Sequence, residues 1–220
     1  MNKPVLIIGG PGHGSVIASC IEDNRIRYND AEWEVAGFIN DFEEGDIDGY
    51  PIIGGTKDIT KLIKSGFYFV WGIHLLQRNL KTYQLFNELN IPESRLATII
   101  HKTAYIAKTS EIGPGVFIMN NAYVSPRVKL GKGTMVKSNA LIAHDVKCGQ
   151  LCHFAMGSIT GAYAELGECA DVAIGCVVLE KRKIGDFAFA GAASLISKDI
   201  PDYEIHVGNP AKFLKKTRID

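Results

Sequence analysis

A six-residue repeat occupies the second half of the chain and restricts its fold more than any other feature. In steps of six from Ile106 to Ile196, fifteen of the sixteen positions are apolar, and Thr160 is the exception. The next position is small in thirteen of the sixteen repeats. Six residues suffice for one short strand and one corner, so three repeats close a triangular coil of eighteen residues. The sequence therefore predicts a parallel β-helix with the apolar positions inside and glycine where the chain bends. A β-sandwich would instead alternate with a period of two.

The first 98 residues follow a different pattern. Short apolar runs at Val5–Ile8, Val35–Ile39 and Phe67–Trp71 alternate with segments of helical composition, among them 75–89. This alternation is typical of a small parallel sheet with helices on its faces, and there is room for about half of a dinucleotide-binding fold. We therefore predict an α/β, half-Rossmann-like domain over residues 1–98 and an all-β parallel helix with a C-terminal tail over residues 99–220.

Composition excludes several classes of partner. The chain has 24 Lys and Arg and 24 Asp and Glu, so no net charge attracts nucleic acid or an anionic membrane. Its N-terminal apolar run is too short for a secretory signal or a membrane span. An odd count of five cysteines is typical of a reducing compartment. We expect a cytoplasmic protein without a nucleic-acid or membrane partner.

Glycines follow the first predicted strand and open the first helix. The spacing Gly9-x-x-Gly12-x-Gly14 suits a phosphate at a helix N-terminus, although it departs from the dinucleotide register and also suits a tight turn. His13 lies inside this loop. Asp41 ends the second strand, at the edge where parallel sheets bind ligands. These residues together favour a nucleotide-sugar pocket.

Two histidines lie in the repeat region. His144 comes two residues after an interior position, so its side chain should point outward, and an imidazole there can accept a proton near neutral pH. His153 follows half a coil later. A zinc site like that of γ-type carbonic anhydrases needs three histidines, and the repeats contain only these two, so no metal is predicted. Cys148, Cys152 and Cys176 fall on interior positions and should be core residues.

The whole pattern resembles a known family. The hexapeptide array, Gly12-His13-Gly14, Ala143-His144-Asp145 and Gly208-Asn209-Pro210-Ala211-Lys212 together are similar to the NeuD/PglD-type sugar acyltransferases over nearly the whole chain. Members of that family acetylate sialic acids or the amino group of nucleotide-linked amino sugars. The resemblance implies a left-handed β-helix, acetyl-CoA as co-substrate, and a homotrimer with its sites in the clefts between neighbouring prisms.

The resemblance also implies roles for individual residues. His144 corresponds to the catalytic base, Asp145 to its orienting carboxylate, and His153 to a histidine close to the acetyl-CoA thioester. Two segments depart from the family pattern, Trp71-Gly72-Ile73-His74 at the sugar pocket and Lys137-Ser138-Asn139 with Ala143 before the catalytic histidine. Further positions line the acetyl-CoA site, namely Ala162, Gly175, Gly191 and Ala192, or the nucleotide-sugar site, namely Gly12, His13, Gly14, Asn40, Asp41 and Gly72.

The resulting hypothesis is an acetyl-CoA-dependent transferase that acetylates the amine of a UDP- or dTDP-linked amino sugar for surface glycan synthesis. O-acetylation of a free or CMP-linked sialic acid is the enzymatic alternative. A trimeric sugar-nucleotide-binding scaffold that has lost the chemistry is the alternative from another class.

Overall fold

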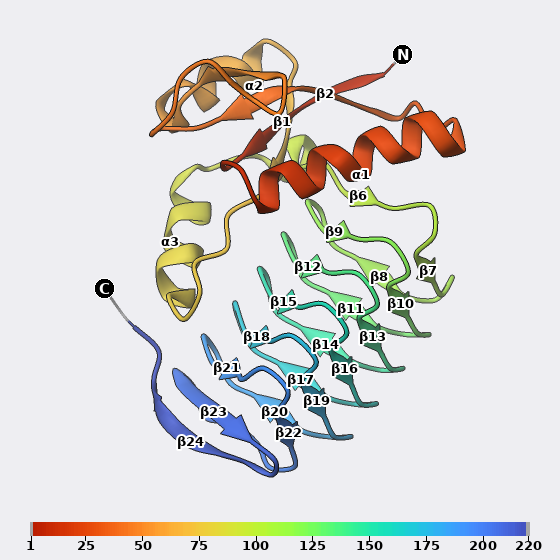
Figure 1. Ribbon diagram of the computed structural model, residues 1–220, viewed down its shortest axis with the longest axis vertical. Helices are drawn as coiled ribbons and strands as arrows, with labels where there is room; N and C mark the ends of the chain where they lie inside the picture. The colour runs from red at the N-terminus through yellow and green to blue at the C-terminus, as the bar shows by residue number, and fades with distance from the viewer. Residues whose placement is uncertain (1, 219–220) are drawn as a thin grey trace.

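The computed structural model describes residues 2–218 and shows an α/β unit at one end of a long three-sided prism (Figure 1). The unit contains a sheet of order β3-β4-β2-β1-β5. Its members are β1 (Lys3–Ile8), β2 (Trp33–Ile39), β3 (Asp46–Ile47), β4 (Tyr50–Gly54) and β5 (Tyr68–Trp71). All pairs are parallel except the β3–β4 hairpin at the edge, which the sequence did not predict.

Three helices accompany this sheet. They are α1 (His13–Tyr28), α2 (Ile59–Lys64) and α3 (Asn79–Glu88), with short 3-10 turns at Thr56–Asp58 and Glu93–Arg95. Helix α3 begins four residues later than predicted. The segment before it is a loop that crosses to the prism, where His74 bonds to Asp171. Among residues 2–218, no helix combines the length and hydropathy that crossing a bilayer requires.

The prism is a left-handed parallel β-helix made of two-residue strands. One face contains β6 (Ile99–Ile100), β9 (Phe117–Ile118), β12 (Met135–Val136), β15 (His153–Phe154), β18 (Asp171–Val172) and β21 (Phe189–Ala190), extended by the hairpin β23 (Glu204–Gly208) and β24 (Ala211–Lys216). The second contains β7 (Tyr105–Ile106), β10 (Tyr123–Val124), β13 (Leu141–Ile142), β16 (Ile159–Thr160), β19 (Val177–Val178) and β22 (Leu195–Ile196). The third contains β8 (Glu111–Ile112), β11 (Lys129–Leu130), β14 (Lys147–Cys148), β17 (Glu165–Leu166) and β20 (Lys183–Ile184).

The repeat anchors fill the prism as predicted. Ile118, Val124, Val136 and Ile142 are fully buried, and Cys152 and Cys176 lie in the same core. A large aliphatic side chain every six residues gives each coil three interior groups, and burial of this apolar surface is what stabilises stacked coils that have no helix or loop of their own. The predicted fold class is confirmed.

The prediction that glycine lies where the chain bends holds for Gly115, Gly133, Gly157 and Gly175, whose φ is 63–71°, but not for the glycines that follow the anchors. The glycines that follow the anchors have ordinary negative φ, and a Cβ on Gly131 would overlap the backbone of the next coil. The bend occurs two positions later, in the left-handed region, where Asn121, Asn139 and Asp145 have φ near 60°. Glycine is therefore needed for close stacking of coils, while mostly non-glycine residues form the corners.

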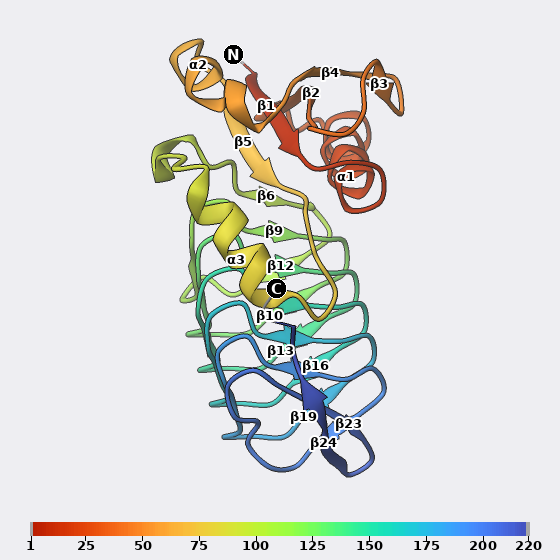
Figure 2. The same ribbon diagram turned by 90° about the vertical axis from the view of Figure 1, so that its left-hand side faces the viewer.

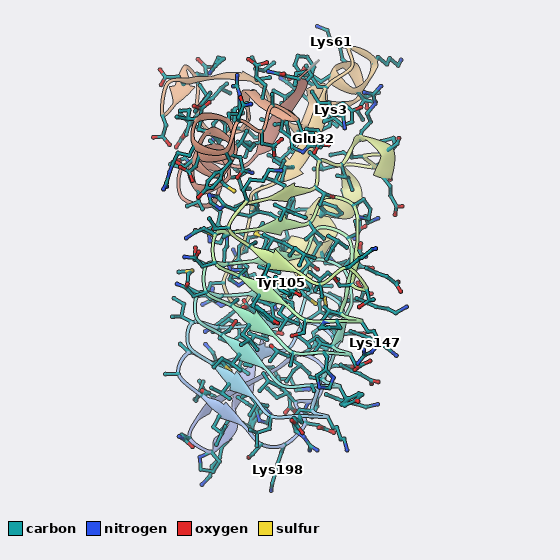
Figure 3. The ribbon with its side chains drawn as sticks, turned by 90° about the vertical axis from the view of Figure 1, so that its right-hand side faces the viewer. Lys3, Glu32, Lys61, Tyr105, Lys147 and Lys198 are labelled. Carbon is teal, nitrogen blue, oxygen red and sulfur yellow. The ribbon has the colours of Figure 1, made fainter. Side chains whose placement is uncertain are left out.

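The outward side chains give each face its own character. On the first face they are buried, and we call it the covered face. The second, which we call the apolar face, presents partly exposed apolar side chains from Tyr105, Tyr123, Leu141, Ile159, Val177 and Leu195. The third, the charged face, presents Glu111, Lys129, Lys147, Glu165 and Lys183. In Figure 3, Tyr105 lies on the face turned to the viewer and Lys147 at its margin.

The α/β unit and its helices lie against the covered face. In α1, the Asn24 side chain donates to the Ile100 carbonyl at 2.9 Å and accepts from the Lys102 N–H at 2.9 Å. Helix α3 lies alongside the coils (Figure 2), where the Asn79 amide donates to the Cys169 carbonyl at 2.7 Å. These bonds satisfy backbone groups at the prism surface and fix the α/β unit to it.

Thr160 is the one polar anchor, and its hydroxyl has no partner among the described residues although the residue is fully buried. Thr160→Val keeps the shape and removes a buried unsatisfied group, so we expect it to stabilise the protein by about 1 kcal/mol and to raise Tm by about 2–4 °C. Thr134→Val is the matched control, because the buried Thr134 hydroxyl does contact the Cys148 sulfur at 3.7 Å. A Thr160→Val protein that melts below the wild type would contradict this account.

Candidate functional site

His144 and Asp145 form a bonded pair at the corner between the apolar and charged faces. Ile142 anchors the preceding strand inside, and the left-handed φ of 61° at Asp145 turns its carboxylate back towards His144. Asp145 Oδ2 lies 2.8 Å from His144 Nδ1. An ionised carboxylate only accepts, so Nδ1 carries the proton and Nε2 is left with a lone pair. The imidazole side chain is 46% exposed, as its outward position predicts.

Arg127 completes this pair, and the sequence analysis missed it. Its guanidinium donates from Nε to Asp145 Oδ1 at 2.8 Å and from Nη2 to Oδ2 at 2.7 Å. These bonds, with a smaller contribution from His144, hold the pKa of Asp145 well below its usual range. The signal was available, because Arg127 precedes Asp145 by eighteen residues and thus occupies the same corner one coil earlier.

The residues predicted to line the acetyl-CoA site lie along both edges of the apolar face. Ala162 is buried one coil beyond His144, at the corner with the charged face. Gly175, Gly191 and Ala192 lie at the opposite corner, with the covered face. Gly175 has open space where a Cβ would stand, whereas Gly191 packs against Val207. One chain alone does not bring these two edges together.

The glycine loop before α1 is closely packed at Gly14 but open at Gly12, where a Cβ would meet nothing within 4 Å. Gly12, with φ 96°, is the N-cap residue of α1 and makes no side-chain cap. A Cβ on Gly14 would stand 2.8 Å from the Phe38 ring, and one on Gly72 would stand 3.1 Å from the Ile8 carbonyl oxygen. Gly14 and Gly72 therefore allow α1, β1 and β5 to approach closely, which is a structural requirement whether or not a ligand binds.

Asn40 and Asp41 line a cavity of about 370 Å³ at the end of β2. Asp41 accepts from the Thr56 N–H at 2.7 Å and from the Thr56 hydroxyl at 2.8 Å, so its carboxylate is already bonded within the protein. Glu43, Glu44 and Asp58 also line this cavity. Such an acidic lining suits hydroxyl and N–H donors, such as those of a ribose or a base, better than phosphates.

His13 and His153 meet in a buried cluster on the covered face. His74, from the loop after β5, stacks on His13 with ring centroids 5.5 Å apart, and its centroid is 4.1 Å from that of His153. Burial, with the nearby charge of Lys137, lowers the pKa of His13 to about 3. Burial also lowers the pKa of Lys137 to about 8. His153 is 8% exposed, and it lies on a different face from His144, so the two histidines do not meet within one chain.

Asp171 and His74 are the members of this cluster that sequence reasoning did not assign. Asp171 stacks directly on His153 in the β15–β18 pair. Its position, eighteen residues after His153, could have been found from the repeat. His74 could not have been found in this way, because it lies outside the repeats.

Comparisons with known proteins agree with both halves of the fold. Residues 4–74 match the model of the PglD N-terminal domain, and residues 109–144 match that of the bacterial transferase hexapeptide (six repeats). The structure is similar to the acetyltransferase domain of PglB from Neisseria gonorrhoeae, in complex with acetyl coenzyme A, at 27% identity and a TM-score of 0.85, covering 97% of this chain and 100% of that one.

Two further proteins are similar. A mutant perosamine N-acetyltransferase from Caulobacter crescentus, in complex with CoA and GDP-perosamine, shares the fold at 23% identity and a TM-score of 0.85, with 97% of each chain covered. The dTDP-3-amino-3,6-dideoxy-alpha-D-galactopyranose 3-N-acetyltransferase of Aneurinibacillus thermoaerophilus is 40% identical over 43 residues, which are 20% of this chain and 22% of that protein. This chain therefore matches about a fifth of the length of its curated relative.

The family models and the structural matches agree with the fold built from the residues, and they confirm the predicted resemblance. The chain combines a PglD N-terminal domain with a left-handed β-helix of bacterial transferase hexapeptide repeats.

Proposed function

We propose that this protein is an acetyl-CoA-dependent N-acetyltransferase that acts on the amino group of a nucleotide-linked amino sugar. The observation that carries the proposal is the outward His144, whose Nδ1 is bonded to Asp145 and whose Nε2 has no hydrogen-bond partner among residues 2–218. The N-terminal domain offers the nucleotide-sugar pocket. The similar proteins described above support this assignment, because they act on or bind nucleotide-linked amino sugars, CoA or acetyl-CoA.

The chemistry is direct attack of the sugar amine on the thioester carbonyl. In the tetrahedral intermediate the nitrogen is positive and the oxygen negative. His144 Nε2 removes the proton from nitrogen, and Asp145 stabilises the imidazolium that results. The intermediate then collapses to the amide as the C–S bond breaks, and the imidazolium returns its proton to the departing CoA sulfur, which leaves as the free thiol. Arg127 keeps Asp145 ionised and in place. No cysteine nucleophile is required, since Cys152 and Cys176 lie inside the prism.

The Ala162 N–H is our candidate donor to the oxyanion. On either side of it the Gly161 N–H is bonded to the Val178 carbonyl, and the Tyr163 N–H to the His144 carbonyl. The Ala162 N–H has no such backbone bond within residues 2–218, so it is free to bind a developing negative charge. One donor of this kind contributes about 3 kcal/mol to a transition state.

The working assembly is a homotrimer of this chain. Of the three prism faces, one is covered by the chain's own α/β unit and one is charged, whereas the apolar face leaves Tyr105, Leu141 and Ile159 about 40–50% exposed. Exposed apolar area of this continuity is typical of an interface. The apolar face also has the His144–Ala162 corner on one edge and the Gly175–Ala192 corner on the other. Packing of neighbouring copies along it brings the two half-sites together around each cleft.

Leu141→Glu should dissociate the trimer and abolish most of the activity, because it places a charge in the middle of the apolar face. Sedimentation at micromolar concentration measures the assembly, and circular dichroism checks that the prism stays folded. Lys147→Glu, on the charged face one strand later in the chain, is the matched control and should remain a trimer. A monomeric wild-type protein with full activity would overturn the assembly.

The function itself is tested by free-thiol release from acetyl-CoA with a panel of UDP-, dTDP- and GDP-linked amino sugars and of free and CMP-linked sialic acid. Turnover of at least one of the amino sugars is expected, with the acetyl group recovered as an amide. Turnover of sialic acid alone would identify an O-acetyltransferase, and binding of nucleotide sugars without any turnover would identify a scaffold.

A further inference from the structure

A second carboxylate–histidine system lies on the covered face, apart from His144 and Asp145. Asp171, 1% exposed, has Oδ1 at 3.0 Å from His153 Nδ1 and Oδ2 at 2.7 Å from His74 Nε2. His153 and Asp171 belong to adjacent coils of the prism, whereas His74 comes from the α/β unit. One buried carboxylate therefore joins the two halves of the chain.

The positions of the protons follow from the geometry. A carboxylate that accepts from both rings requires the protons on His153 Nδ1 and His74 Nε2. Burial alone would raise the pKa of Asp171, but the bonds and charges of His153 and His74 outweigh it and hold that pKa below its usual range. Burial lowers the pKa of His153. The geometry is thus an ionised carboxylate that accepts one N–H from each of two imidazoles.

This arrangement leaves a lone pair on His153 Nε2. That atom is buried and has no hydrogen-bond partner within residues 2–218. An unsatisfied buried acceptor is destabilising, so its retention calls for a ligand group that donates to it. An N–H donor is available in both substrates of the proposed reaction, the pantetheine amides and the sugar amine.

A bound metal ion is the competing interpretation of the same residues. His74, His153 and Asp171 place one ligand atom each within 4.8 Å of one another. However, the two carboxylate oxygens of Asp171 each contact a different ring, and the His74 and His153 rings lie with centroids 4.1 Å apart and planes tilted by 32°. The contacts of 2.7 and 3.0 Å are also ordinary hydrogen-bond lengths. Hydrogen bonding accounts for the geometry better than a metal does.

We propose that Asp171 and His74 are positioning residues that hold His153 in its Nδ1–H form, so that Nε2 accepts an N–H from a bound substrate. His74 lies in the segment 71–74, where the sequence departs from the family pattern. Through His74 and Asp171, the sugar-nucleotide domain helps to orient the His153 ring of the prism. The expected effect on kcat rests on the proposed acetyltransferase function. The positions of the protons on His74 and His153 do not depend on that function.

Two variants test the proposal. His74→Phe keeps a ring against His13 and removes the donor to Asp171. Asp171→Asn keeps the size of the side chain, but its NH₂ group must donate to one of the two rings. The ring nitrogen that accepts this bond must then be unprotonated. We expect each variant to lower kcat by about 10- to 100-fold with little change in KM, less than the roughly 10⁴-fold cost of removing the orienting carboxylate of a serine-protease triad. His206→Phe is the matched control, because His206 also contacts a carboxylate, with Nε2 at 2.9 Å from Glu204 Oε2. The activity of this variant should stay at the wild-type level.

The direct readout is the tautomer of His153, measured by NMR of ¹⁵N-histidine-labelled protein. The wild type should show His153 protonated at Nδ1, the minority form of a free imidazole, and both variants should change that signal while the His206 signal remains. An Nε2–H form in the folded wild type, or wild-type turnover in both folded variants, would overturn the proposal. Titration with zinc chloride that gave one bound ion per chain, lost in His74→Phe, would replace it with a metal site. If the Nδ1–H form is found but no amino sugar is acetylated, the positioning stands and the proposed function fails.

Discussion

Replacing His144 with asparagine should lower kcat by about 10²–10⁴-fold while acetyl-CoA still binds, because the variant loses the group that takes the proton from the attacking amine. A sugar amine has a pKa of about 8 by analogy with an α-amino group, so raising the pH deprotonates more of it and should partly restore the rate. Steady-state kinetics between neutral and alkaline pH, with acetyl-CoA binding measured by calorimetry, checks both statements.

Asp145→Asn is the graded control for this experiment. It should cost less than the loss of His144, since the imidazole remains and only its orientation and the charge beside it are lost. Normal turnover by His144→Asn would falsify the base assignment. Radiolabelled acetyl trapped covalently on the protein would also contradict direct transfer, because it requires an acyl-enzyme.

Leu166→Asp should destabilise the protein by about 3–5 kcal/mol, since it places an unpaired charge among the apolar groups inside the prism. Leu166 is 5% exposed and belongs to the continuous interior core. Thermal or denaturant unfolding measures the loss.

Glu165→Gln, one residue earlier, provides the comparison. Glu165 points outward on the charged face and pairs with Lys183 at 3.1 Å, an exposed contact worth only about 0.5 kcal/mol. Equal melting temperatures for Leu166→Asp and the wild type would show that the alternation of inside and outside positions is assigned wrongly.

The repeat made the prism predictable because its signal is local and is copied many times. The anchors from Ile118 to Ile196, with the exception of Thr160, meet the same requirement for an apolar group inside the prism. The same register, extended by eighteen residues, would have predicted Arg127 beside Asp145 and Asp171 beside His153. Contacts between the two halves lay beyond this reasoning. His74 and Asp171 are 97 residues apart in the chain, and no periodicity connects a loop of the α/β unit with a strand of the prism.

For the predicted sugar pocket, the sequence located the residues correctly but did not show what they contact. Asn40 and Asp41 lie at the end of β2 as expected, but only the structure shows that Asp41 is already bonded to Thr56. The assignment of Gly14 and Gly72 to substrate binding likewise rests on a pattern that close packing explains on its own. The sequence alone does not distinguish a loop glycine that binds a phosphate from one that allows a neighbouring backbone to approach.

The different characters of the three prism faces limit how such a chain can change in length. An insertion of eighteen residues adds one full coil and leaves every later strand on its original face. An insertion of six residues, although it preserves the hexapeptide motif, moves every later strand to the next face. The lysines and glutamates of the charged face would then come to lie under the helices, and the buried groups of the covered face would come to lie on the apolar face. Selection on this prism should therefore admit whole coils and reject single hexapeptides.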